Sequence, residues 1–357
     1  MDRIWTKHKQ INTTLKPKVF VGMSGGVDSS VAAFLLKKAG YNVTGVFIKA
    51  WSPDWTECAW REDRQSAMRA AAHLGIPLIS FDFGESYKRD VVDYLLDEYR
   101  AGRTPNPDVM CNKRIKFGAF FDEAMHRGAD YIATGHYARA CDGGLCVAKD
   151  IVKDQTYFLW MLDHQHLAKT LFPIGEFTKP EVRDIARNAG LPNAERKDSQ
   201  GLCFVGPVNI KDFLKRYIAT TPGDVLDEKG TRIGRHDGAI LYTIGERHGF
   251  SVEPSSSHEF PRYVVAKDVA ANTLTVSSAP LESVSSTQRI VLADINWING
   301  NSPTADSCHA RVRYRQPLQA CRIEGNVVLF DNPQICSPGQ SLVVYDGERM
   351  LGGGIIV

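Results

Sequence analysis

The residues best able to do chemistry in this 357-residue chain lie in three short stretches. The first, SGGVDSS at 24–30, stands between a short apolar run and an apolar-periodic run. This order predicts a strand, a glycine turn and a helix start, where unpaired backbone N–H groups and the helix dipole favour phosphate. The two glycines allow positive φ and close backbone approach, while the serines add hydroxyl donors.

Asp28 is the unusual member of this stretch, because a carboxylate beside phosphates repels them unless a cation lies between. We interpret it as a residue that faces Mg²⁺ or caps the helix. The stretch lacks the GxxxxGK[ST] order, so no loop lysine is available for the β- and γ-phosphates. From these residues alone, an ordinary strand-to-helix turn remains the alternative.

Cys111 lies in the second stretch, TPNPDVMCNK at 104–113, which two prolines stiffen. It stands just before an expected helix start, and Lys113 and Arg114 follow it. A helix N-terminus beside cations lowers the pKa of a thiol, so we expect an available thiolate. Asp108 is placed to donate or accept a proton beside it. A buried structural cysteine is the alternative.

Cys203 lies in the third stretch, DSQGLCFVG at 198–206. The polar and glycine-rich residues before it indicate an accessible loop, whereas the apolar residues around it would equally suit a buried strand. Spacing leaves these alternatives open. Nothing in the sequence shows that Cys111 and Cys203 meet.

Strands and helices alternate in the part of the chain that must position these stretches. Short apolar runs predict strands at 18–23, 42–49, 78–83 and 130–134. Helical periodicity predicts helices at 27–39, 61–74, 85–100 and 113–127. This order predicts an α/β fold with a doubly wound, mostly parallel sheet, whose ligands bind at the carboxyl ends of the strands.

The remainder of the chain has a different character. Two further helices are expected at 180–188 and 209–218. Short strands separated by turn residues then predict a small barrel, at 262–267, 273–276, 288–292, 310–315, 319–323, 326–330 and 341–345. We therefore expect a catalytic domain at 1–208, a small connecting domain at 209–280 and a β-barrel domain at 281–357.

Cations alternate with apolar residues in RVRYR at 311–315. On a strand, this spacing would place three arginines on one face, able to follow a phosphate backbone, and Tyr314 could stack on a base. A solvated face is the alternative.

Composition limits the partners and the compartment. The formal net charge of +2 is nearly balanced, so any nucleic-acid binding must come from local patches. Eight cysteines without CxxC spacing argue for a reducing compartment and against a disulfide framework or a zinc site. No apolar run approaches the ~20 residues of a membrane span. The basic, polar leader at 1–18 is interpreted as a frayed extension, with an organellar presequence as the alternative.

Six strings along the chain, SGGVDSS, TPNPDVMCNKRIKF, ATGHYAR, KDQTYFL, DSQGLCFVG and YTIGERHGF, resemble in this order the bacterial-type tRNA 2-thiouridylase family of PP-loop ATP pyrophosphatases. The resemblance covers nearly the whole chain. It implies an adenine nucleotide alpha hydrolase-like domain followed by a small central domain and a β-barrel. It also implies that ATP, with Mg²⁺, adenylates the 2-carbonyl of the wobble uridine of tRNA, and that sulfur then replaces AMP.

The family's functional residues carry over by motif. Cys203 would take a persulfide from a sulfur carrier protein, Cys111 would be the partner nucleophile, and a Cys111–Cys203 disulfide would result. Asp108 would be the general acid/base. The implied ATP contacts are Gly22, Met23, Ser24, Gly25, Gly26, Val27, Asp28, Ser29, Ile48 and Gly135. The implied tRNA contacts are Asn106, Pro107, Asp108, Lys153, Asp154, Gln155, Arg313 and Tyr314.

The resemblance further implies a cytoplasmic monomer that binds tRNA and no membrane. The sequence departs from the family pattern at Glu246, His248 and Arg262, which affects the central domain more than the catalytic residues. Two other functions remain open at this point. One is a PP-loop synthetase that adenylates a small molecule, and the other is an RNA-binding protein with a structural nucleotide loop.

Overall fold

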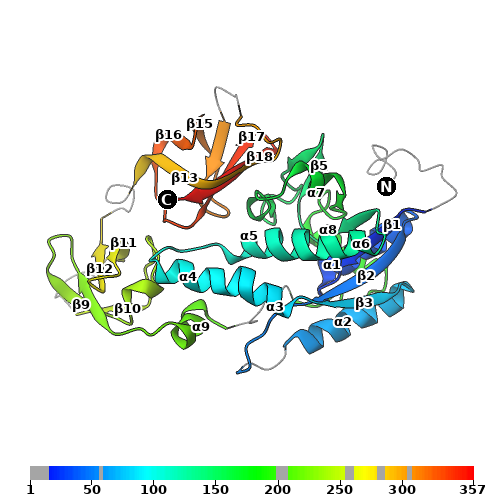
Figure 1. Cartoon of the computed structure of the whole chain (residues 1–357), viewed down its shortest axis with the longest axis horizontal. Coiled ribbons are helices and arrows are strands. Elements are labelled where there is room, and N and C mark those ends of the chain that lie inside the picture. Colours follow the sequence, from blue (N-terminus) through cyan, green and yellow to red (C-terminus); the bar gives the residue numbers. More distant parts are fainter. Residues whose placement is uncertain (1–15, 56–58, 198–207, 254–260, 280–285, 304–307) are drawn as a thin grey trace.

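The computed structural model describes residues 16–55, 59–197, 208–253, 261–279, 286–303 and 308–357. These residues form three β-sheets, and the longer helices gather around the first (Figure 1). Among the described residues, no helix combines the length and the apolar character needed to cross a membrane.

The first sheet is fully parallel and has the order β3-β2-β1-β4-β7. Its strands are β1 (Lys18–Gly22), β2 (Asn42–Lys49), β3 (Leu78–Asp82), β4 (Tyr131–Ala133) and β7 (Thr170–Leu171). The predicted doubly wound sheet is confirmed, with each of the four predicted strands present. Alternate residues of central β1 enter different cores, Val19 and Val21 in one and Phe20 in the other. Both faces are therefore covered, as parallel sheets require.

The helices divide between the two faces of this sheet. One core includes residues of α1 (Val27–Lys38), α2 (Ala59–Leu74) and α8 (Lys179–Asn188). The other includes residues of two long helical segments. The first segment joins α3 (Gly84–Tyr87), the π-helix η1 (Lys88–Asp93) and α4 (Tyr94–Arg100), and the second joins α5 (Pro107–Cys111), the π-helix η2 (Asn112–Ala119) and α6 (Phe120–His126).

The second of these segments begins at Pro107 rather than at the predicted residue 113. The Asn106 side chain accepts the Val109 N–H at 3.4 Å, and Pro107 occupies the first helical turn, where its missing N–H costs nothing. The prediction that Cys111 precedes the helix is therefore wrong. Cys111 lies inside the helix, immediately before its π-helical part, a feature found often at functional sites.

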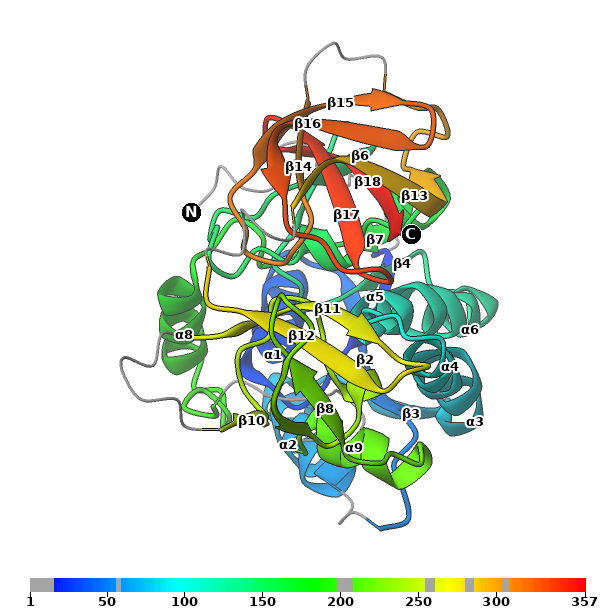
Figure 2. The same cartoon turned by 90° about the vertical axis from the view of Figure 1, so that its left-hand side faces the viewer.

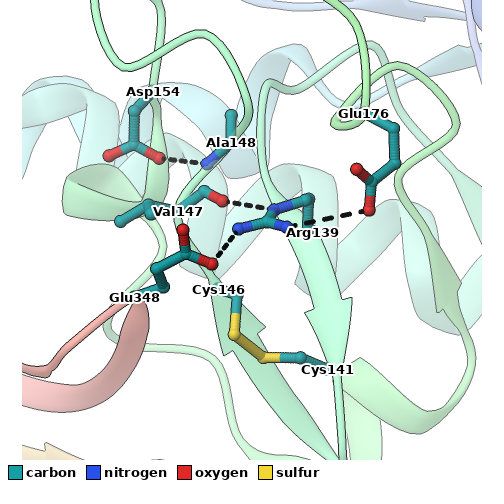
Figure 3. Close-up of a disulfide and its surroundings, with 8 residues drawn as sticks. All are labelled: Arg139, Cys141, Cys146, Val147, Ala148, Asp154, Glu176 and Glu348. Atoms are coloured by element: carbon teal, nitrogen blue, oxygen red, sulfur yellow. Dashed lines mark hydrogen bonds and ion pairs between the residues drawn. A yellow bond between two sulfur atoms is a disulfide. The ribbon is translucent and has the colours of Figure 1, made fainter.

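A short hairpin links the first domain to the barrel. Its strands β5 (Arg139–Cys141) and β6 (Gly144–Cys146) pair with each other, and β6 also pairs with β18 of the barrel. A disulfide between Cys141 and Cys146 closes the hairpin (Figure 3). The argument against a disulfide framework thus missed one local disulfide. The elements η3 (Thr156–Phe158) and α7 (His164–Ala168) follow.

The second sheet has the order β10-β9-β8-β12-β11 and lies beside α9 (Figure 2). Its strands are β8 (Gly223–Leu226), β9 (Arg232–His236), β10 (Phe250–Val252), β11 (Tyr263–Asp268) and β12 (Thr273–Ser277). The helical elements in this part are α9 (Ile210–Tyr217) and η4 (Ala239–Leu241).

The third sheet closes into the predicted barrel, because β13 pairs with both β16 and β18. The assignment of the strands at 262–267 and 273–276 to the barrel is wrong, because they form β11 and β12 of the second sheet. Its strands are β13 (Thr287–Trp297), β14 (Cys308–Arg311), β15 (Gln319–Glu324), β16 (Val327–Gln334), β17 (Ser341–Asp346) and β18 (Arg349–Ile356). The sequence analysis missed β18 because LGGGII resembles a turn. Glycine is required there, since a Cβ at Gly352 would lie 2.1 Å from the Asn296 carbonyl oxygen.

Candidate active site

The phosphate loop, residues 23–29, comprises the turn that connects β1 to α1, as predicted, and the first three residues of α1. Gly25 has φ +82°, and a Cβ there would lie 2.3 Å from the Asp63 carbonyl oxygen, so only glycine fits. Helix α1 begins at Val27 with Gly26 as its N-cap, and no side chain caps it. The interpretation of Asp28 as a helix cap is therefore wrong.

The carbonyl groups of Gly25 and Gly26 in the loop accept hydrogen bonds from side chains of later elements. Ser66 Oγ donates to the Gly25 carbonyl at 2.7 Å, and Asn193 Nδ2 donates to the same oxygen at 2.8 Å and to the Gly26 carbonyl at 3.2 Å. Arg196 adds a bond to Gly25 at 3.2 Å. Because a peptide N–H points opposite to its carbonyl, this arrangement leaves the N–H groups at the start of α1 to the ligand side.

Asp28 is neutralised by a lysine from another element. Both of its carboxylate oxygens lie 2.8 Å from Lys179 Nζ, and Tyr137 donates its hydroxyl to Oδ1 at 2.9 Å. Lys179 is the first residue of α8 and is only 8% exposed. The cation that the loop sequence lacks therefore comes from a position far along the chain.

The sequence analysis missed both Lys179 and Asn193. A signal for Lys179 was present, because a lysine in the first turn of a helix opposes the helix dipole and needs a local partner. The helix start itself was readable from the capping box of Thr178 and Glu181. Asn193 had no such signal. It bonds the loop carbonyls only because the chain after α8 folds back to the loop, and the residues around Asn193 do not indicate this.

Gly135 lies directly against the phosphate loop. A Cβ at this position would come within 2.7 Å of the Ser29 backbone nitrogen and 2.9 Å of the Asp28 carbonyl carbon. Ile48 lies near the carboxyl end of β2, two residues beyond the Gly22–Val46 register pair. Both residues thus lie at the edge of the sheet that carries the loop, as expected, while their contact with ATP stays a prediction.

The described residues do not form a ligand set for magnesium. No group of three or more His, Cys, Asp or Glu side chains that could hold a metal ion occurs among them. The carboxylate of the loop, Asp28, is already bonded to Lys179 and Tyr137. Any magnesium ion at this loop would therefore need the phosphates of ATP as its main ligands.

Cys111 is a free thiol that is 3% exposed. Burial raises its pKa, and this effect outweighs the opposing influence of Lys116 and of a hydrogen bond with Tyr87. The expectation of a thiolate available in the resting protein is therefore wrong. Asp108 lies one helical turn earlier, and its charge also raises the pKa of the thiol.

The chain is held on both sides of Cys111, by the barrel before it and by Phe158 of η3 after it. Gln340 Nε2 donates to the Thr104 carbonyl at 2.8 Å, before α5. After Cys111, Asn112 donates its amide to the Phe158 carbonyl at 3.0 Å, and the Phe158 ring packs on Tyr314 with a centroid distance of 4.5 Å. The Asn112 side-chain oxygen is buried without a hydrogen-bond partner among the described residues. Predicted tRNA contacts from distant parts of the chain thus meet beside the Cys111 helix.

The predicted tRNA segment 153–155 is anchored beside the phosphate loop. The backbone N–H groups of Gln155 and Tyr137 each donate across to the other residue, to the Tyr137 carbonyl and to Gln155 Oε1, both at 2.9 Å. Asp154 is 2% exposed, and burial raises its pKa although Ala148 and Thr156 donate to its carboxylate. Its carboxylate shapes the loop from inside, and contact of this segment with tRNA stays a prediction.

The arginine stripe does not form. Strand β14 ends at Arg311, which is 8% exposed and lies over the ring of Tyr345. Arg313 donates to the Ile244 carbonyl of the central part at 3.0 Å, and burial lowers its pKa. Arg315 takes φ +63° and lies over the Tyr314 ring. The prediction of three arginines on one strand face is therefore wrong, because the chain turns after Arg311.

Cys203 and its whole motif fall within 198–207, outside the described residues, as does most of the leader at 1–18. The structure therefore brings together the phosphate loop, Gly135 and segment 153–155. It places the Cys111 helix against Phe158 and Tyr314.

Three family models match consecutive parts of the chain: the tRNA methyl transferase HUP domain at 17–207, the tRNA methyl transferase PRC-barrel domain at 211–278 and the aminomethyltransferase beta-barrel domain at 287–356. The tRNA-specific 2-thiouridylase MnmA of Thiobacillus denitrificans is 45% identical over 357 residues, covering 96% of this chain and 100% of that protein. Its counterpart in Alcanivorax borkumensis is 46% identical over 352 residues, covering 95% and 97%.

Among solved structures, a 4-thiouridine synthetase–RNA complex with bound ATP matches with a TM-score of 0.39 and 22% identity, covering 56% of this chain and 50% of that one. This likeness is too low to carry a functional argument. The near full-length identity to the curated relatives does carry one, and the chain belongs to the tRNA-specific 2-thiouridylase family.

Proposed function

We propose that this protein is an ATP-dependent tRNA sulfurtransferase that converts the 2-carbonyl of a tRNA uridine to a 2-thiocarbonyl. The observation that carries the proposal is the near full-length match to tRNA-specific 2-thiouridylases, in a chain whose phosphate loop is assembled without a Walker lysine. A loop of this kind suits a reaction in which pyrophosphate leaves, because it binds phosphates through backbone N–H groups.

In the activation step, the uracil 2-oxygen attacks the α-phosphorus of ATP and pyrophosphate departs. The N–H groups at the start of α1 bind the departing phosphates, and Lys179 neutralises the Asp28 carboxylate that would otherwise repel them. Magnesium would accompany ATP as a counter-ion of its phosphates. The product is an adenylated uridine, in which AMP has become a good leaving group.

In the sulfur step, Cys203 carries a persulfide received from a sulfur carrier protein. The Cys111 thiolate attacks the Cys203 sulfur of this persulfide, forms a Cys111–Cys203 disulfide and releases hydrosulfide. Hydrosulfide adds to C2 of the activated uridine and displaces AMP, leaving the thiocarbonyl. Asp108 accepts the proton of the Cys111 thiol as the thiolate forms. A reductant then restores both thiols.

These reaction steps require the buried Cys111 thiol to become exposed. The thiol is buried in the described structure, where burial raises its pKa. We propose that tRNA binding draws the segment around Asn106, Pro107 and Asp108 toward the target base and exposes Cys111. The π-helical residues that follow Cys111 give the helix a local irregularity at which such a change can occur.

Further parts of the proposal follow the family. The target is the wobble uridine, and the contacts of tRNA include Lys153, Gln155 and Tyr314. The protein acts as a monomer in the cytoplasm, where tRNA is available.

The experiment combines purified protein with ATP, tRNA and sulfide, followed by a thiol-sensitive gel shift of the tRNA. We expect shifted tRNA and AMP formation that depends on tRNA. With a persulfide donor in place of sulfide, Cys203→Ser should abolish thiolation and leave adenylation intact. Failure of tRNA to stimulate AMP formation would favour an RNA-binding module, and AMP formation with a small molecule instead would favour a synthetase.

A further inference from the structure

Two neighbouring apolar side chains stand in solvent at the turn that precedes Lys153. Ile151 is 76% exposed and Val152 is 67% exposed, at a turn between β6 and η3. Single exposed apolar residues are ordinary on protein surfaces. Two adjacent β-branched residues at one turn are less so, and we refer to them as the apolar tip.

The turn that carries the apolar tip is tightly held. Asp150 Oδ2 accepts the Lys179 N–H at 2.8 Å, and its Oδ1 accepts the Lys153 N–H at 3.2 Å. The Lys153 N–H also lies 3.1 Å from the Asp150 carbonyl oxygen. The backbone on each side of the tip is therefore fixed while the tip itself points outward.

The chain leading to this turn is held as firmly (Figure 3). Arg139 Nε donates to the Val147 carbonyl at 2.6 Å, and its guanidinium also pairs with Glu348 at 2.6 Å. Asp154 accepts the Ala148 N–H at 3.0 Å, which ties the two sides of the turn together. A rigid support that presents exposed apolar side chains fits a contact surface better than a frayed loop.

The position of the apolar tip relates it to the reaction. Asp150 binds the backbone of Lys179, and the side chain of the same lysine binds Asp28 in the phosphate loop. A target uracil must reach the α-phosphate of ATP at this loop. The nucleotides next to it must then pass close to the residues that border the loop, and Lys179 links one of these residues, Asp28, to the turn that carries the apolar tip.

We propose that the apolar tip packs against the face of the unpaired base adjacent to the target uridine and keeps the target base out of the stack. Apolar side chains that enter a base step in this way separate bases and turn them outward. This inference rests on the proposed function, because it takes tRNA as the substrate.

Two features favour RNA over a protein partner as the occupant. The apolar tip consists of two side chains, far less than the roughly 800 Å² that each partner buries in a standard protein interface. Two side chains do match the face of one base. The turn is also followed by the cation Lys153, which suits a phosphate beside the base, whereas Lys149 pairs with Glu181 at 2.8 Å.

The test replaces both residues in the full-length protein, as Ile151→Ser with Val152→Ser. Both side chains are exposed, so the melting temperature should not change. The probe is an anticodon stem-loop RNA with uridine at the wobble position. We expect binding to weaken by about 10-fold, the effect of losing one buried aliphatic side chain. The matched control is Met68→Ser on α2, which also removes an exposed apolar side chain and should bind normally.

A second RNA, abasic at the nucleotide adjacent to the target, completes a double-mutant cycle. The wild-type protein should bind the abasic RNA about 10-fold more weakly than the intact RNA. The double variant should bind both RNAs equally, because the contact with the base is already absent. Additive losses, or unchanged binding by the double variant, would overturn the proposal.

Sulfide-driven and donor-driven thiolation are compared in the same preparation. A loss confined to the reaction driven by a persulfide donor protein would overturn the proposal in favour of a protein-docking role. If wild-type protein itself fails to thiolate tRNA with sulfide, the proposed function fails instead. Retention of wild-type binding by Ile151→Leu with Val152→Leu would support an apolar contact rather than a need for these particular side chains.

Discussion

The phosphate loop and the Cys111 helix belong to one domain, but the loop is already arranged to bind a ligand while the Cys111 thiol is buried. The loop has its carbonyls bonded by Ser66, Asn193 and Arg196, and its carboxylate is neutralised by Lys179. The N–H groups of Ser24 and Gly26 donate to the hydroxyls of Ser29 and Ser24 at 3.3 and 3.4 Å, so a ligand would replace these two long bonds while the backbone stays in place. Cys111, by contrast, is buried within a continuous helix, and its pKa is raised.

This difference separates the two half-reactions. An activation site that is already assembled can bind ATP at any time, because binding ATP alone commits no chemistry. In the proposed mechanism Cys111 attacks a persulfide, and a thiol able to do so also reacts with many oxidants; burial as the neutral thiol slows such side reactions. We infer that activation is prepared in the free protein and that sulfur transfer waits for the substrate.

The largest expected effect comes from Cys111→Ser. Removal of a nucleophile costs about three orders of magnitude or more in the step it performs, so thiolation driven by a persulfide donor should disappear. Formation of AMP with tRNA should persist, because the phosphate loop does not involve this thiol. The readouts are the gel shift of the tRNA and the release of labelled AMP. Cys336→Ser, a free cysteine of the barrel, is the control expected to retain thiolation.

The next largest effect is expected from Gly135→Ala, which disturbs the phosphate loop and not the Cys111 helix. The new Cβ would lie 2.7 Å from the Ser29 nitrogen, so the loop must shift, and we expect AMP formation to fall by about 100-fold. The protection of Cys111 against alkylation should be unchanged. Gly40→Ala also replaces a glycine near α1 but meets no atom within 4 Å, and it should reduce stability by only about 1 kcal/mol. Equal loss of activity in both variants would contradict a local effect on the loop.

A smaller effect is expected from Lys179→Met. The substitution leaves Asp28 without its cation beside the phosphates, so the KM for ATP should rise by about 10-fold. Adding Asp28→Asn should restore part of the affinity, because the repulsion is then removed. A steady-state ATP titration of both variants measures this coupling. If the second substitution only adds to the loss, the two residues act independently.

The smallest effect concerns pH. Burial raises the pKa of Cys111 in the folded protein, so the folded state holds the thiol proton more tightly than the unfolded chain. The stabilisation is fully present below the pKa of the unfolded thiol and is lost as pH rises through the folded pKa. Urea unfolding between pH 7 and pH 10 should show a shallower decline for Cys111→Ala than for wild type. Identical slopes would place Cys111 in a more polar environment than the structure shows.

The fold was largely predictable because its elements carry local signals. The strands of the first sheet are short apolar runs, and the expected helix at 27–39 matches α1 (Val27–Lys38) closely. Failures occurred where tertiary context overrides local pattern. Strand β18 is rich in glycine because neighbouring strands approach it closely, and the arginines after β14 leave the strand because the chain turns.

The site was predictable in its motifs but not in its electrostatics. Residues 24–30 indicated phosphate binding by order alone. The state of Cys111 was predicted incorrectly, because the flanking cations are visible in the sequence while the surrounding apolar core is not. Lys179 and Asn193 reach the loop only through the return of a distant segment. The start of α8 marks Lys179 as a residue in need of a partner, but no local pattern shows that this partner is Asp28, and none marks Asn193.

The central claim is that activation is assembled while Cys111 stays shielded, and one measurement tests it directly. The protein is saturated with ATP in the absence of tRNA and treated with iodoacetamide, and bound nucleotide and alkylation of the Cys111 peptide are quantified in the same sample. We predict one bound ATP per protein and alkylation of Cys111 at least about 100-fold slower than in the urea-unfolded chain. Alkylation at the rate of the unfolded chain, with ATP bound, would contradict the account.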